Sequence, residues 1–82
     1  MSGGLRLALE GTSREDRRLR FARVSLSRVG DGQEIALVTD ARGRLRYRLP
    51  RGEYLLSLDE AAEQHFQVGD SWTTVRIHLP SA

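Results

Sequence analysis

Residues 36–58 of this 82-residue chain, with the sequence ALVTDARGRLRYRLPRGEYLLSL, contain its clearest pattern of alternating apolar and polar residues. Apolar side chains recur at every second position around two short turns, and a period of two is typical of β-strands with one buried face. Each turn contains a glycine, Gly43 or Gly52, where a tight connection often needs positive φ. The stretch therefore predicts three strands joined by two turns, over residues 35–39, 45–49 and 54–58.

The same alternation continues on both sides of this stretch. It predicts four further strands, over residues 5–9, 21–29, 65–68 and 72–79. Residues 12–18 are polar and predict a mobile surface loop, with at most one helical turn capped by Ser13. Residues 59–64 contain good helix formers but support only a short helix or a loop. Seven short strands separated by turn residues favour an antiparallel sandwich or barrel.

Length and composition limit the classes of protein to consider. Eighty-two residues make one small domain, residues 1–82, with a single core. The chain has no cysteine, so we expect no disulfide and no thiolate metal site. No stretch approaches the roughly 20 apolar residues of a membrane helix, and no signal peptide is visible. We therefore expect no membrane association and a cytoplasmic location, or an extracytoplasmic one if the chain is a fragment of a larger protein.

Arginine provides the strongest candidate for a binding surface. All thirteen basic residues are arginine, although the net charge is only +2. Arg44, Arg46 and Arg48 alternate with the apolar positions of one strand, which places them on one face about 6.5–7 Å apart. Arg23 and Arg76 also point outward from their strands. We expect these five residues to bind an acidic partner; the alternative is a solvated face that guards against edge pairing.

Two segments combine turn residues and core residues at fixed spacing. Thr39, Asp40 and Gly43 form a T-D-x-x-G motif, and residues 49–54 form an L-P-x-G-x-Y motif. With the preceding A-x-V-x-L strand over residues 22–26, they resemble the carboxypeptidase regulatory-like domains of the prealbumin-like group. The resemblance covers nearly the whole chain and implies a seven-stranded antiparallel Greek-key β-sandwich. It also implies an accessory or binding role, since such domains commonly lie beside enzymes or in surface proteins.

No catalytic or metal site stands out. His65 and His78 have no metal-ligand spacing, and no nucleophile motif accompanies either of them. The related hydroxyisourate hydrolases need a His/Arg/His set and a Tyr-Arg-Gly-Ser terminus, whereas this chain ends Leu-Pro-Ser-Ala. We therefore expect no enzyme, no cofactor and no metal.

The sequence predicts a non-catalytic module that binds another protein or domain. Five acids and no arginine occur in residues 53–70, so weak head-to-tail self-association is also expected. An alternative is carbohydrate binding centred on Trp72, which follows a turn at the start of a strand. Polyanion binding through the row formed by Arg44, Arg46 and Arg48 is a further alternative. We do not expect the protein to bind nucleic acid. Tyr47, Tyr54 and Phe66 are predicted to face inward, which leaves few aromatic side chains to stack on bases.

Overall fold

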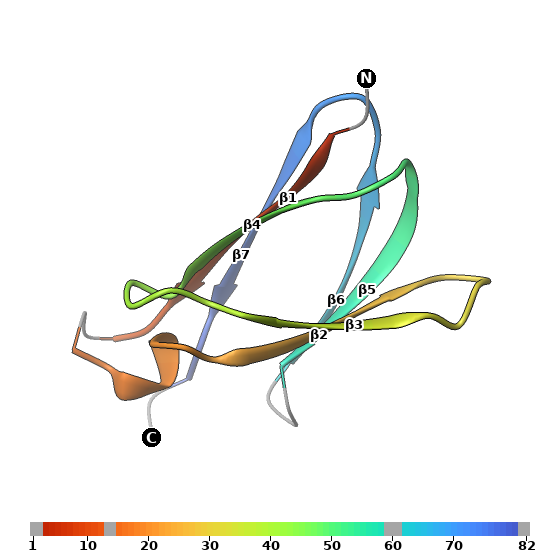
Figure 1. Cartoon of the computed structure of the whole chain (residues 1–82). Helices are drawn as coiled ribbons and strands as arrows, with labels where there is room; N and C mark the ends of the chain where they lie inside the picture. Colours follow the sequence, from red (N-terminus) through yellow and green to blue (C-terminus); the bar gives the residue numbers. More distant parts are fainter. Residues whose placement is uncertain (1–2, 13–14, 59–61, 81–82) are drawn as a thin grey trace.

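The computed structural model describes residues 3–12, 15–58 and 62–80, which form seven strands and one 3-10 turn. In chain order these are β1 Gly4–Glu10, η1 Arg17–Leu19, β2 Arg23–Arg28, β3 Glu34–Val38, β4 Arg44–Arg48, β5 Gly52–Leu58, β6 Ala62–Val68 and β7 Trp72–His78. One sheet, called sheet A, has the order β4-β1-β7, and the other, sheet B, has the order β3-β2-β5-β6. The two sheets form two layers (Figure 1). The expected seven-stranded β-sandwich is confirmed.

The core lies between the sheets and is built from alternate residues of the strands. Leu5, Leu7 and Leu9 of β1 are nearly inaccessible to solvent, as are Leu26 of β2 and Leu56 of β5. Burying one such side chain contributes about 1.5–3 kcal/mol before the ordering entropy is subtracted. The remaining core side chains are Leu19, Val24, Leu49, Tyr54, Leu58, Phe66, Val68, Val75, Ile77 and Leu79.

The T-D-x-x-G segment turns the chain from sheet B to sheet A. The hydroxyl of Thr39, which is 1% exposed, accepts a hydrogen bond from the Ala22 N–H and donates one to the Leu19 carbonyl, both at 2.8 Å. The Asp40 carboxylate accepts from the N–H groups of Arg42 and Arg44 at 2.8 and 2.9 Å. Gly43 follows with a φ of 77°. Each residue of the motif therefore meets a specific need of the turn.

The L-P-x-G-x-Y segment is held by its tyrosine. The Tyr54 hydroxyl donates to the Pro50 carbonyl at 2.8 Å, which fixes the turn between β4 and β5. The ring of Tyr54 stacks on Phe66 of the neighbouring strand β6, with 5.6 Å between centroids. A single side chain thus joins a turn to the core.

One strand pair departs from the antiparallel arrangement. β1 pairs with β4 antiparallel but with β7 parallel. Parallel neighbours need a long connection, and here nearly the whole chain lies between the two strands. No local turn therefore dictates the relative direction of β1 and β7.

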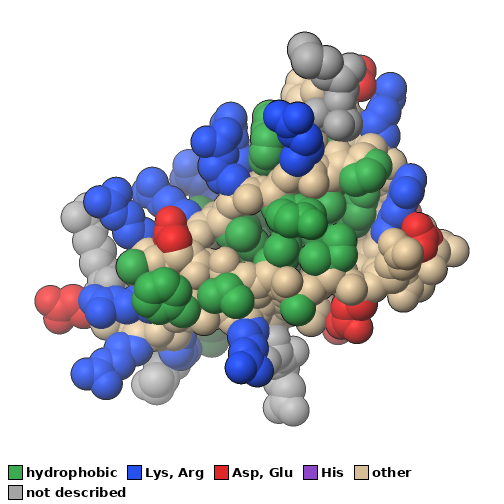
Figure 2. Space-filling model, viewed as in Figure 1, with side chains coloured by type: hydrophobic (Ala, Val, Ile, Leu, Met, Phe, Trp, Pro, Cys, Tyr) green, Lys and Arg blue, Asp and Glu red, His purple; other side chains and the backbone are tan. Residues whose placement is uncertain are grey.

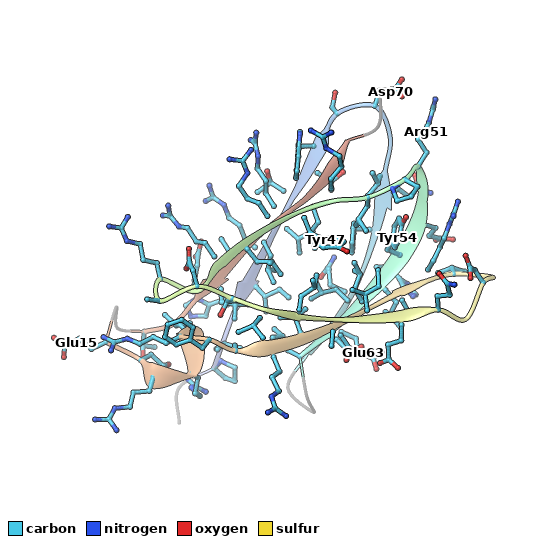
Figure 3. The ribbon with its side chains drawn as sticks, viewed as in Figure 1. Glu15, Tyr47, Arg51, Tyr54, Glu63 and Asp70 are labelled. Atoms are coloured by element: carbon cyan, nitrogen blue, oxygen red, sulfur yellow. The ribbon has the colours of Figure 1, made fainter. Side chains whose placement is uncertain are left out.

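Tyr47 was expected in the core, and that expectation is wrong in one respect. Tyr47 pairs with Leu5 of β1, and because Leu5 is buried, Tyr47 also faces the interior. Figure 3 shows Tyr47 and Tyr54 between the two sheets. Yet Tyr47 remains 37% exposed. β4 is an edge strand, and β3, the edge of sheet B on the same side, diverges from it beyond the turn at Asp40 (Figure 1). Nothing in the described chain covers Tyr47 on this open side.

Two predicted loops also differ in detail. The polar segment contains the 3-10 turn η1, which is capped by Asp16 through the Arg18 N–H; Ser13 lies outside the described residues. Residues 62–64, predicted as helix or loop, begin β6, because pairing with β5 outweighs their helix preference; residues 59–61 lie outside the described part. No helix among the described residues has the length and apolar character needed to cross a membrane.

Candidate functional site

Arginine side chains point outward from all three strands of sheet A. The register places Arg46 beside Arg6, and Arg6 beside Thr74. One step along the sheet, Arg44 and Arg76 lie on either side of Ala8. We call the resulting surface the arginine face, and it consists of Arg6, Arg44, Arg46, Arg48 and Arg76.

Acidic side chains neutralise little of the arginine face. Among the described strand residues on this side of sheet A, Glu10 is the sole acid, and it lies 3.9 Å from Arg76 in an exposed pair. Such a pair contributes little, at most about 1 kcal/mol. The carboxylate of Asp40 is engaged by backbone N–H groups of its own turn, which hold its pKa below the usual value. Figure 2 shows the basic side chains along the margin of the molecule above β4.

Trp72 belongs to the same surface. The register places it next to Gly4, and a Cβ on Gly4 would lie 2.6 Å from Cζ3 of the indole, so the ring lies directly over the glycine. The guanidinium carbons of Arg6 and Arg46 lie 5.7 and 5.2 Å from the ring centroid, within cation–π range. The indole therefore helps to hold two guanidinium groups near one another.

The arginine face is hollowed rather than flat. A shallow depression of about 780 Å³ lies over the middle of sheet A, and its lining includes Arg6, Arg44, Arg46, Thr74 and Arg76. Four of the five residues of the arginine face therefore line one concavity. Four positive charges around one concavity can hold carboxylate, phosphate or sulfate groups through charge-assisted hydrogen bonds.

Arg23 does not join this surface. It lies on β2, and its side chain points outward from sheet B, on the opposite side of the sandwich. Three acids, Glu34, Glu53 and Glu63, share that outer side of sheet B. The two outer surfaces of the sandwich therefore differ in charge, basic on sheet A and mainly acidic on sheet B.

The two histidines lie on opposite surfaces as well. His65 points outward from β6 of sheet B, and His78 points outward from β7 of sheet A. They cannot act together within one chain. The described residues contain no group of three or more His, Cys, Asp or Glu that could hold a metal ion.

The alternation of residues predicted that Arg44, Arg46, Arg48 and Arg76 point outward, but it did not show which of their strands share a sheet. Arg6 and Arg76 come from strands about forty residues before and thirty after β4, and only the strand order shows that they share its sheet. Gly4 carried no signal of its own, because its role depends on the position of the Trp72 ring.

The protein is thus an all-β, prealbumin-like sandwich in which the outer side of sheet A is basic. Searches with the sequence found no matching family model and no matching curated protein. Several solved structures match in fold, among them the two that follow. The Bacillus anthracis TIE protein superposes with a TM-score of 0.78 at 17% identity, over 96% of this chain and 16% of that chain. The Klebsiella pneumoniae 5-hydroxyisourate hydrolase superposes with a TM-score of 0.72 at 23% identity, over 95% of this chain and 90% of that chain.

These likenesses carry the fold and nothing more. This chain spans about one sixth of the TIE protein's chain, so the likeness is to one part of that protein. Both identities are low, and the prealbumin-like sandwich is a fold that supports different functions. The function has to be inferred from the surface itself.

Proposed function

We propose that this protein is a non-catalytic interaction module that binds an acidic protein or domain through the arginine face. One observation carries the proposal: four arginines of the arginine face, from three adjacent strands, line one depression whose described lining contains two carboxylates, that of Glu10 and that of Asp40, which its own turn engages. Like charges held this close cost free energy in the isolated protein. An acidic partner would relieve that repulsion and gain charge-assisted hydrogen bonds.

The chemistry of the surface supports a carboxylate-bearing partner. Arginine presents a planar fork of donors that matches carboxylates in a bidentate arrangement. Trp72 restrains Arg6 and Arg46, which lowers the conformational entropy that binding would otherwise cost. The motifs around Thr39 and Tyr54 resemble carboxypeptidase regulatory-like domains, and such domains commonly serve as accessory modules. That resemblance supports a binding role over a catalytic one.

Charge reversal on the arginine face tests the proposal. Poly-L-glutamate serves as the probe, and its affinity for the wild-type protein is compared with that for the variant Arg44→Glu/Arg46→Glu/Arg48→Glu. We expect the variant to lose at least about tenfold in affinity and the remaining binding to lose its salt dependence. Calorimetry measures both affinities, because the variant lacks the Arg46 guanidinium that lies against the ring of Trp72, the single tryptophan, and the two fluorescence signals are therefore not comparable.

The matched control reverses three arginines outside the arginine face. Arg17→Glu/Arg20→Glu/Arg23→Glu changes the net charge by the same amount, and all three side chains are exposed. We expect this variant to bind almost as well as the wild type. Equal losses in both variants would mean that bulk charge alone attracts the probe. Binding to heparin with no affinity for poly-L-glutamate would favour a polyanionic sugar over a protein partner and overturn the proposal.

A further inference from the structure

The edge of β4 presents backbone hydrogen-bonding groups beside the arginine side chains. Leu9 N–H donates to the Gly43 carbonyl at 2.9 Å, and Leu49 N–H donates to the Gly3 carbonyl at 3.2 Å. Hydrogen-bonded and non-hydrogen-bonded pairs alternate along an antiparallel ladder. The odd-numbered residues of β4 therefore bond to β1, and the even-numbered ones direct their N–H and C=O groups away from it.

The accessible part of this edge begins after Arg44. The Arg44 carbonyl accepts from the Asp40 N–H at 2.8 Å, and the Arg44 N–H donates to the Asp40 carboxylate. Arg46 and Arg48 follow, and within the described chain β4 has no neighbour other than β1. These two residues thus offer two N–H and two C=O groups to an added strand, on the same residues whose guanidinium groups form the arginine face.

The other side of the same edge is apolar. Tyr47 faces the interior yet is 37% exposed, and Leu45 is only partly buried against the core. Figure 2 shows apolar side chains in the open side of the sandwich, between β4 and β3. A strand added to β4 would cover this apolar surface with its inward side chains.

We propose that the β4 edge binds an extended polypeptide segment with alternating acidic and apolar residues. This inference rests on the proposed function and specifies the partner: acidic side chains opposite Arg46 and Arg48, and an apolar one opposite Tyr47. Directly opposed side chains on neighbouring strands interact most strongly, and opposite charges there are favourable. Addition of a strand to a sheet edge is a common way for a domain to bind a peptide.

The occupant is a segment of another protein and not a second β4. Pairing two copies of β4 would place arginine against arginine on one face, and like charges directly opposite one another are destabilising. An acidic segment reverses the sign of the same contacts. Its apolar residues would also shield Tyr47 from water.

Synthetic peptides test the alternation. The first probe is an acetylated and amidated Glu-Val-Glu-Val-Glu-Val peptide, and its control is Glu-Glu-Glu-Val-Val-Val, which has the same charge and composition. Binding is followed by the fluorescence of Trp72 and by calorimetry. We expect the alternating peptide to bind roughly tenfold more tightly, because only it can place acids and apolar side chains on opposite faces of a strand.

Backbone methylation then tests strand pairing. In an antiparallel addition the glutamates opposite Arg46 and Arg48 exchange both hydrogen bonds with them, whereas the valine N–H groups point away. N-methylation of the glutamates should weaken binding about threefold to tenfold for each bond lost, and N-methylation of the valines should leave it nearly unchanged. The reverse order would indicate parallel addition to the same edge.

The outcomes separate this inference from the function on which it rests. Equal affinity of the alternating and block peptides, or equal effects of the two methylations, overturns strand addition. The proposed function survives that result if Arg44→Glu/Arg46→Glu/Arg48→Glu still abolishes binding of poly-L-glutamate. No binding of any acidic polypeptide to the wild-type protein overturns both.

Discussion

At the scale of the residue, two aspartate side chains hold their turns by accepting hydrogen bonds. Asp40 accepts two backbone hydrogen bonds, from Arg44 and Arg42, and these hold its pKa below the usual value of a carboxyl group. The side chain of Arg18 and its N–H lower the pKa of Asp16 in the same way. Both acids therefore bind their proton less readily in the folded than in the unfolded state.

This difference predicts a loss of stability in acid. A folded-state pKa below the unfolded value gives stabilisation that is complete above the unfolded pKa and disappears as the pH falls through the lower folded pKa. We expect the melting temperature to fall as the pH is lowered below about 4. Asp40→Asn should reduce this pH dependence, whereas Asp31→Asn, in another exposed turn, should keep it. Thermal unfolding from pH 2 to pH 7 measures the effect, and identical profiles for wild type and Asp40→Asn would contradict it.

At the scale of the element, the sequence predicted which segments are strands because their alternation is local. Leu45, Leu49 and Tyr54 face the interior as the period of two requires. The exposure of Tyr47 could not be predicted, since it depends on how far β3 diverges from β4 across the sandwich. The sheet that Arg23 and Arg76 join was equally hidden, because strand order is set by contacts between distant segments.

The junction between η1, β2 and β3 yields a prediction at the same scale. Thr39 alone links the Leu19 carbonyl to the Ala22 N–H through one buried hydroxyl. Thr39→Val keeps the shape and leaves both backbone groups unsatisfied, which should cost about 1–3 kcal/mol. Thr74→Val, at an exposed position of β7, is the control and should change the free energy of unfolding little. Chemical denaturation measures both, and equal values for the two variants would rule out a bridging role for Thr39.

At the scale of the molecule, the two outer surfaces carry opposite charge. The arginine face lies on sheet A, and Glu34, Glu53 and Glu63 lie on the outer side of sheet B. Different surfaces that complement one another produce head-to-tail contacts, which need not close into a ring. The same charges that would hold an acidic partner can therefore also draw two copies of the chain together.

Self-association should accordingly depend on salt. We expect the sedimentation coefficient to rise with protein concentration at about 0.01 M ionic strength and to stay constant at about 0.5 M, where the Debye length is a few ångströms. The charge-reversed variant Arg44→Glu/Arg46→Glu/Arg48→Glu should remain monomeric in both buffers. An association that persists at high salt would point to apolar contacts in place of these charges.

The parallel pairing of β1 with β7 has a consequence for how the protein is made. β1 lies in the middle of sheet A, between β4 and β7, so during synthesis the first strand has its final neighbours only after residue 78 has left the ribosome. Sheet B can assemble earlier from β2, β3 and β5, which pair over shorter sequence distances. Long-range closure of this kind slows folding to the range of milliseconds to seconds. The nascent chain therefore carries β1 as an unfinished edge until β7 has emerged.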